Sequence, residues 1–193
     1  MADENKNKNA KANPNNWVNL HGDYLYNYAY SRVQSKETAE DLVQESFISA
    51  LKSINSFRGD SSELTWLIAI LKRKVIDYYR KLSRKKETVA SQFSTPFQEN
   101  GDFEGHWILD RGPKDWQIKH DDPMRQSEFI FILEICIAAL PEKWRSVFVL
   151  KVMEEIKSEE VCKEIGCSSS NLWVILHRAR LQLRECIENR WLK

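Results

Sequence analysis

The sequence is poor in the residues that interrupt helices, with only six glycines and five prolines among 193 residues. This scarcity disfavours a β protein, which needs many tight turns. The longest apolar run, residues 130–140, contains Glu134 and is too short to cross a bilayer. The first 16 residues are polar and lack the apolar core of a signal peptide. We therefore expect a cytoplasmic protein that does not contact a membrane.

Catalytic motifs are also missing. The sequence contains no Gly-rich phosphate loop, no GxSxG and no HExxH. Asp41 and Glu45 lie four residues apart, a spacing that general acid–base pairs can have on a helix. Without any further catalytic group, we expect these two carboxylates to form an acidic or protein-docking surface. The pattern predicts a protein that is not an enzyme and that uses no cofactor.

The four cysteines form no CxxC pair, which disfavours a redox motif. Cys162, Cys167 and His177 match no common zinc-site spacing, so we expect no metal site. Because no export signal precedes them, we predict reduced thiols that are buried as small apolar side chains. The cysteines are Cys136, Cys162, Cys167 and Cys186.

The net charge is almost zero, with 29 basic and 28 acidic residues, but the charges are unevenly distributed. Residues 72–86 contain eight Lys and Arg, one acid (Asp77) and two tyrosines. Residues 87–126 hold four basic and eight acidic residues, and residues 127–193 hold ten of each. Because fields are screened within about 8–10 Å at physiological salt, the local excess matters more than the total. Basic residues interleaved with aromatic ones predict a nucleic-acid-binding surface at 72–86.

Apolar residues recur at helical spacing in the first half of the chain. We predict helices at residues 17–33, 35–54 and 63–83, a loop at 55–62, and a disordered tail at 1–16. The side chains expected to face the core from the first helix are Trp17, Leu20, Tyr24, Tyr28 and Val33. In the second predicted helix, the side chains expected to face the core are Ala39, Leu42, Val43, Phe47, Ala50, Leu51 and Ile54.

The second half begins with an acidic segment and then returns to helical spacing. The segment at 87–125 predicts an interdomain linker, parts of which dock on a domain or partner because it holds several large apolar residues. Further helices are predicted at residues 126–140, 141–153, 158–165 and 169–189. Gly166 and Ser168 lie between the last two, a spacing typical of a helix-turn-helix. The predicted class is all-α, with two small helical domains joined by a partly ordered linker.

Five strings in register resemble the extracytoplasmic-function class of bacterial RNA polymerase sigma factors. They are AEDLVQESF, FRGDSSELTWL, VIDYYRK, LPEKWRSVFVLK and LHRARLQLRE. The resemblance implies a region 2-like domain at 17–86, the linker at 87–125 and a region 4-like domain at 126–193. It implies a sigma factor that binds core polymerase, recognises a promoter and promotes strand opening.

The resemblance also implies roles for particular residues. Those expected to dock on the clamp helices of the largest polymerase subunit are Asp41, Gln44, Glu45 and Phe47. Two sets are expected at the minus-ten element. A flipped base of the melted strand would be held by Phe57, Arg58, Asp60, Ser61 and Ser62. Its phosphates would be bound by Lys72, Arg73, Lys74, Arg80 and Lys81. Those expected at the duplex minus-thirty-five element are Ser168, Ser169, Ser170, Asn171, Trp173, His177, Arg178 and Arg180. The second domain would also bind the flap of the second-largest subunit.

The sequence departs from the family pattern in two places. Arg73 stands where the family commonly has Asn, which puts base choice at the minus-ten element in question. Trp173, Val174 and Ile175 stand where the family usually has a basic, a small polar and an Arg residue. They also lie off the apolar stripe by which the predicted helix at 169–189 is expected to face the core. Either this helix is rotated and more buried, or the domain recognises the upstream element weakly. In the second case the apolar patch would bind an anti-sigma or recruiting protein.

Two other functions remain open on the sequence alone. A stand-alone helix-turn-helix regulator would bind duplex DNA as a dimer, but it leaves the DLVQESF segment and the basic third helix without a role. A pure interaction module would only titrate another factor.

Overall fold

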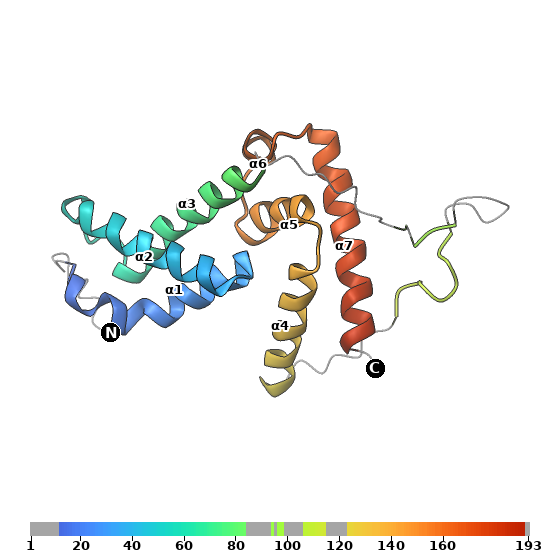
Figure 1. The fold of residues 1–193 in the computed structure, drawn as a ribbon, viewed down its shortest axis with the longest axis horizontal. Coiled ribbons are helices and arrows are strands. Elements are labelled where there is room, and N and C mark those ends of the chain that lie inside the picture. Colours follow the sequence, from blue (N-terminus) through green and yellow to red (C-terminus); the bar gives the residue numbers. More distant parts are fainter. Residues whose placement is uncertain (1–11, 84–93, 95, 99–105, 115–122, 192–193) are drawn as a thin grey trace, which may run out of the picture. The chain divides into compact units, whose positions relative to one another are not determined.

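The computed structural model describes residues 12–83, 94, 96–98, 106–114 and 123–191. These residues are largely helical, with one isolated antiparallel bridge between Phe97 and Trp107 (Figure 1). The chain divides into two compact units, Met1–Tyr79 and Arg80–Lys193. The predicted all-α class with two helical regions is confirmed. Within the described ranges, no helix is long and apolar enough to cross a membrane.

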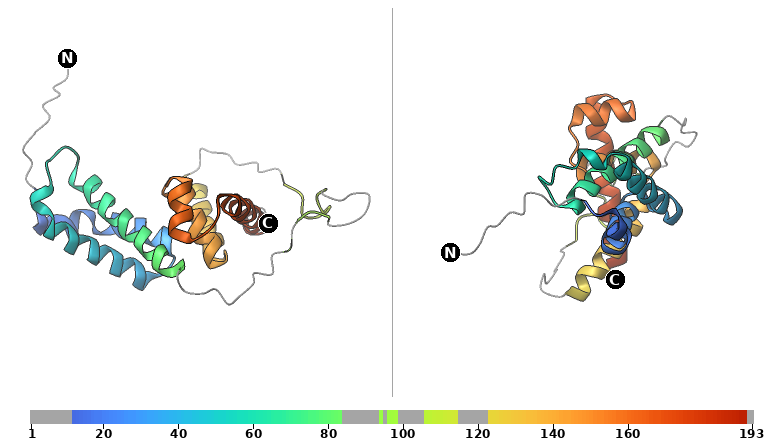
Figure 2. Two further views of the ribbon diagram at one scale, coloured as in Figure 1. Left: turned by 90° about the horizontal axis from the view of Figure 1, so that it is seen from above. Right: turned by 90° about the vertical axis from the view of Figure 1, so that its left-hand side faces the viewer.

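The first unit contains three long helices that lie alongside one another (Figures 1 and 2). They are α1 (Trp17–Val33), α2 (Lys36–Lys52) and α3 (Glu63–Ser83). The Ser35 hydroxyl accepts a hydrogen bond from the Thr38 amide at 3.3 Å and caps α2, as its sequence predicts. A 3₁₀ turn, Ile54–Ser56, follows α2 and leads into the loop before α3.

The core face of α1 differs from the predicted one. Leu25, Ala29 and Val33 are buried at i, i+4 and i+8, whereas Leu20 and Tyr24 are 68% and 53% exposed. The prediction was ambiguous because tyrosine is amphipathic, so that a stripe of tyrosines resembles an apolar face at the level of sequence. Leu51 of α2, also predicted to face the core, is half exposed.

The predicted N-terminal tail is ordered where the structure describes it. Pro14–Asn16 form a 3₁₀ turn directly before α1. The carboxylate of Glu63 on α3 accepts hydrogen bonds from the Asn13 amide at 2.9 Å and from the Trp17 indole at 2.6 Å. These bonds join the start of α1 to the start of α3. Residues 1–11 lie outside the described ranges.

In its described residues, the second unit contains four α-helices and one π-helical turn. They are α4 (Pro123–Ala138), α5 (Glu142–Phe148), the π turn Val149–Met153, α6 (Ser158–Ile165) and α7 (Ser169–Trp191). The single helix predicted at 141–153 is therefore α5 continued by the π turn. Pro141 occupies the N-cap position of α5, where its missing N–H has no cost.

The prediction of reduced thiols is wrong for two of the four cysteines. Cys136 of α4 and Cys186 of α7 form a disulfide with their Cα atoms 5.8 Å apart. Sequence spacing cannot reveal such a pair, because 50 residues separate the two cysteines and only helix packing brings them together. Cys162 and Cys167 are free, as predicted, although both are only partly buried. Burial, followed by the neighbouring Cys162 thiol, raises the pKa of Cys167 to about 11, so this thiol is protonated at neutral pH.

Candidate nucleic-acid and partner interfaces

An exposed stripe runs along α2. Asp41, Gln44 and Glu45 are all exposed, as their predicted docking role requires. Ile48 and Leu51 are 52% and 50% exposed and continue the same stripe at i+7 and i+10 from Asp41. We call these five residues the α2 stripe. Sequence reasoning missed Ile48 and assigned Leu51 to the core, although the helical spacing from Asp41 could have found both.

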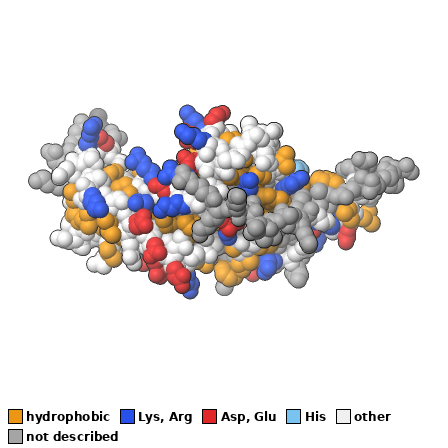
Figure 3. Space-filling view, turned by 45° about the horizontal axis from the view of Figure 1, so that its top comes forward, with side chains coloured by type: hydrophobic (Ala, Val, Ile, Leu, Met, Phe, Trp, Pro, Cys, Tyr) orange, Lys and Arg blue, Asp and Glu red, His pale blue; other side chains and the backbone are white. Residues whose placement is uncertain are grey.

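The acidic end of the α2 stripe lies close to the basic residues of α3. Figure 3 shows acidic (red) and basic (blue) side chains lying beside one another on this face. The two groups meet where Lys74 Nζ lies 3.2 Å from Glu45 Oε2. This pair is exposed and therefore weak, so it leaves both groups able to exchange partners.

Phe47 is the predicted docking residue that does not belong to the α2 stripe. It is half-buried, and its ring stacks on Trp17 with 6.4 Å between centroids. Trp17 also contacts Trp66 edge-on at 5.9 Å, and Trp66 contacts Phe57 at 5.1 Å. These four residues, one from each of α1, α2, the loop and α3, form an aromatic cluster under the loop before α3. Trp66 is therefore packed against other aromatic rings within the unit.

The loop before α3 projects a short polar surface. Arg58, Asp60 and Ser61 are exposed, while Phe57 is held in the aromatic cluster. Gly59 has a φ of 73°, a left-handed conformation that favours glycine. The Ser62 hydroxyl accepts a hydrogen bond from the Thr65 amide at 3.1 Å and caps α3. The loop is thus fixed at both ends, and its exposed side chains lie between these anchors.

The predicted phosphate-binding residues of α3 differ in exposure. Arg73 and Lys81 are exposed, whereas Lys72, Lys74 and Arg80 are partly buried. Lys74 is also the partner of Glu45. The remaining members of the basic run, Arg84, Lys85 and Lys86, lie outside the described residues. Arg73 and Lys81 are consequently the described cations of α3 most accessible to a phosphate backbone.

The second unit contains the predicted helix-turn-helix. Gly166 ends α6 with a φ of 71°, and its amide donates to the Cys162 carbonyl at 2.9 Å. The Ser168 hydroxyl then accepts from the Asn171 amide at 3.2 Å and caps α7. Val161 and Ile165 of α6 are buried, as is Leu172 of α7. The turn and the two helix ends therefore follow the local signals in the sequence.

The predicted DNA-binding residues of α7 all lie on its exposed side. They are Ser169, Ser170, Asn171, Trp173, His177, Arg178 and Arg180, with the cap Ser168 before them. Trp173 and Val174 are 52% and 45% exposed, but Ile175 is only 5% exposed. The expectation that all three lie off the buried face is thus wrong for Ile175. The core face of α7 includes positions i and i+3 as well as i+4, a wider stripe than the sequence predicts.

Part of the linker docks on α7, as its apolar content predicted. The described segments 94, 96–98 and 106–114, here called the linker finger, are joined by the Phe97–Trp107 bridge. The Gln98 amide donates to the His106 carbonyl and the Ile108 amide to the Pro96 carbonyl, both at 2.9 Å. The rings of Phe97 and Trp107 lie 4.5 Å apart. Phe103 and Trp116, two further large apolar residues of the linker sequence, lie outside the described ranges.

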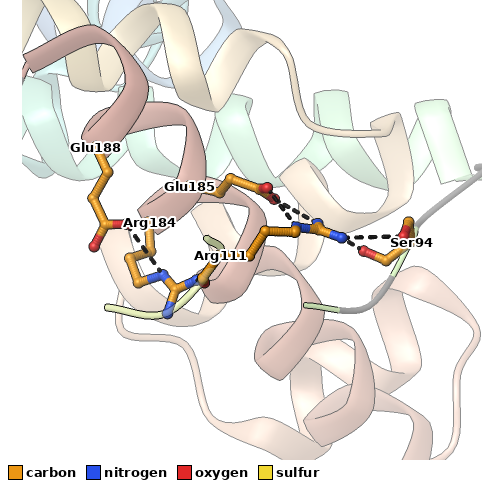
Figure 4. Close-up of polar contacts among 5 residues, drawn as sticks. All are labelled: Ser94, Arg111, Arg184, Glu185 and Glu188. Atoms are coloured by element: carbon orange, nitrogen blue, oxygen red, sulfur yellow. Dashed lines mark hydrogen bonds and ion pairs between the residues drawn. The ribbon is translucent and has the colours of Figure 1, made fainter. Parts of the chain in front are cut away.

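Arg111 anchors the linker finger (Figure 4). Its guanidinium donates two hydrogen bonds to the Glu185 carboxylate, at 2.8 and 2.9 Å, and two to Ser94, at 3.1 Å. The bond to Glu185 raises the pKa of Arg111, so the guanidinium stays charged. In return, Arg184 donates to the Arg111 carbonyl at 2.8 Å and lies over the Trp107 ring. The linker finger is therefore a folded part of the second unit.

Arg111→Glu is expected to release the linker finger, because two carboxylates would then face each other at residue 185. The amides of Gln98 and Ile108 should exchange with deuterium about 10- to 100-fold faster, the range expected for losing charge-assisted bonds. Adding Glu185→Arg should restore slow exchange, whereas Arg190→Glu, an exposed change on the same helix, should have no effect. Unchanged exchange in Arg111→Glu would contradict the anchoring role.

The first unit thus has a basic helix beside the partly acidic α2 stripe, and the second unit has a helix-turn-helix. This combination defines a two-part nucleic-acid-binding protein of helical class. Residues 17–85 match the family model "Sigma-70 region 2", and residues 130–183 match "Sigma-70, region 4". The chain belongs to the sigma-70 family and is an RNA polymerase sigma factor of the extracytoplasmic-function type.

Two sequence relatives agree with this assignment, and one solved structure is also similar. A "Probable RNA polymerase sigma factor" of Haemophilus influenzae is 37% identical over 168 residues, which are 86% of this chain and 85% of that protein. The sigma factor YlaC of Bacillus subtilis is 32% identical over 83% of this chain and 84% of its own length. The sigma factor RpoE of Bartonella quintana, solved with the anti-sigma factor NepR, covers 91% of this chain and 97% of its own at 20% identity, with a TM-score of 0.41.

The family assignment separates the functions that the sequence left open. A sigma factor acts in transcription initiation and is not an enzyme. The region 2 match covers the DLVQESF segment and the basic third helix, which a stand-alone helix-turn-helix regulator would not use. The linker finger and its partners Arg184, Glu185 and Glu188 lie outside both matched ranges.

Proposed function

We propose that the α2 stripe is the surface by which this sigma factor docks on the clamp helices of the largest polymerase subunit. Two exposed apolar side chains, Ile48 and Leu51, lie beside Asp41 and Gln44 on one helix face. Apolar anchors beside acidic and amide groups suit a protein interface that also selects its partner by charge. The second unit binds the flap of the second-largest subunit, and the complex acts in the cytoplasm.

The first unit also recognises the minus-ten element. Exposed Arg58, Asp60 and Ser61 lie between two fixed loop ends, which supports capture of a base flipped from the melted strand. Arg73 and Lys81 lie further along α3 and neutralise other phosphates of the same promoter element. Because Phe57 and Ser62 are engaged in the aromatic cluster and the α3 cap, they position the loop instead of contacting DNA freely.

One experiment tests this function as a whole. The full chain is added to sigma-free core polymerase, and initiation is mapped on genomic DNA. Initiation at a discrete set of promoters supports the proposal. Specific duplex binding without polymerase would favour a stand-alone regulator, and inactivity in both assays would overturn autonomous promoter recognition.

The Arg73→Ala/Lys81→Ala variant tests the phosphate contacts. Each lost contact removes one released counterion, so the plot of log binding constant against log salt should become shallower by roughly 0.7–0.9 per residue. The loss should be similar on different promoters, since phosphate contacts carry no sequence information. The matched variant Lys36→Ala/Lys157→Ala removes two exposed lysines elsewhere and should keep the original slope. A defect on some promoters only would contradict the assignment.

A further inference from the structure

We infer that Trp173 and Val174 of α7 recognise thymine methyl groups in the major groove of the upstream promoter element. The inference rests on the proposed sigma-factor function and on the role that the resemblance implies for α7, the helix expected at the duplex minus-thirty-five element. It assigns a specificity-determining role to two residues that depart from the family pattern.

The exposure of α7 fixes which side chains face outward. Leu172, Ile175 and Leu176 are buried and define the core face. Trp173 and Val174 are about half exposed and lie five and six residues after the Ser168 cap. In helix-turn-helix proteins, the residues near the N-terminus of the second helix contact base edges. The two apolar side chains therefore occupy positions from which bases are recognised.

The surroundings of this apolar pair suit DNA. Residues 168–180 contain no acid, and the exposed positions one turn away from the pair carry Ser170, Asn171, His177 and Arg178. Arg180 is also exposed further along the helix. Positive charge and short polar side chains around the pair complement phosphates and base edges. These charged and polar neighbours favour a DNA groove as the binding partner. A protein surface is less favoured, because the centre of a protein interface is usually depleted of charge.

The buried position of Ile175 strengthens this choice of partner. With Ile175 in the core, the exposed apolar surface at this point of α7 consists of two adjacent side chains. Neither side chain can accept a hydrogen bond from a base, and valine cannot donate one. The one apolar group that a base pair presents in the major groove is the thymine methyl. Thymine is therefore the base that the apolar surfaces of this pair can distinguish.

The test uses holoenzyme reconstituted with the full chain. The preferred upstream element is first selected from a randomised promoter library and is expected to contain thymine. Deoxyuridine, which lacks only the methyl group, then replaces these thymines. Open-complex formation should fall about three- to fivefold per recognised methyl, the loss expected for one buried carbon. The same replacement in the spacer should have no effect.

Two variants show which side chains respond. Val174→Thr keeps the shape of valine, and Trp173→Ala removes the indole; each should lower the sensitivity to deoxyuridine. Val152→Thr, a matched change at another exposed valine of the second unit, should retain full sensitivity.

The outcomes separate this inference from the proposed function. Normal initiation with no response to deoxyuridine, or a selected element without thymine, overturns methyl recognition and leaves the sigma-factor function intact. The same holds if the variants keep full sensitivity and lose only binding to a protein partner. Failure of the wild type to initiate with polymerase overturns the proposed function itself, and with it the inference.

Discussion

The Asp41→Lys/Glu45→Lys variant is expected to lose binding to core polymerase by at least about 100-fold. Both residues are exposed on the α2 stripe, so lysines there would bring positive charge to a surface proposed to bind through carboxylates. Reversing a charge at the centre of an interface costs several kcal/mol, and 100-fold corresponds to about 2.7 kcal/mol. Equilibrium binding of the purified protein to core polymerase measures the effect.

A matched charge reversal distinguishes docking from a general field effect. Asp23 is exposed on α1, away from the α2 stripe, so Asp23→Lys should bind core polymerase normally. Asp41→Lys alone should already weaken binding, while the helix content of both proteins remains that of the wild type. Equal losses in Asp23→Lys and Asp41→Lys would show that α2 is not the docking helix.

The second large effect is expected from Trp17→Ala, which should destabilise the first unit by about 3–5 kcal/mol. Trp17 is 1% exposed, its ring contacts Phe47 and Trp66, and its indole donates to Glu63. Removing it leaves a cavity under the loop before α3 and takes one donor from the Glu63 carboxylate. Hydrogen exchange of α1–α3 in the full chain, measured over a urea series, reports this loss separately from the second unit.

Trp173→Ala supplies the control, because the same chemical change is made at an exposed position. Surface substitutions of this kind usually change the free energy of unfolding by no more than about 0.5 kcal/mol. Since Phe57 and Trp66 belong to the aromatic cluster, Trp17→Ala should also impair strand opening. Similar stability losses in the two variants would contradict the central position of Trp17.

Local signals in the sequence were sufficient for most of the fold. Ser35 and Gly166 mark helix ends correctly, because caps and left-handed turns depend on residues only a few positions apart. The face that each helix buries depends on its neighbours, and the sequence alone does not contain that information. This is why Leu20 and Tyr24 were assigned to the core and Ile175 to the surface.

The candidate interfaces show the same contrast between local features, which could be predicted, and long-range contacts, which could not. The exposure of Asp41, Gln44 and the polar residues of α7 could be predicted from motifs and helical spacing. Three further contacts join residues distant in the sequence and needed the structure: Lys74 with Glu45, Arg111 with Glu185, and Cys136 with Cys186.

The docked linker finger also limits how far the chain can extend between α3 and α4. From the end of α3 at Ser83 to the first anchored residue, Ser94, an extended chain spans at most about 40 Å. If the finger were released, the chain from Ser83 to the start of α4 at Pro123 could span about 140 Å. The contact between Arg111 and Glu185 therefore shortens the maximum contour length by roughly 100 Å, and it must break before the chain can extend beyond the shorter limit.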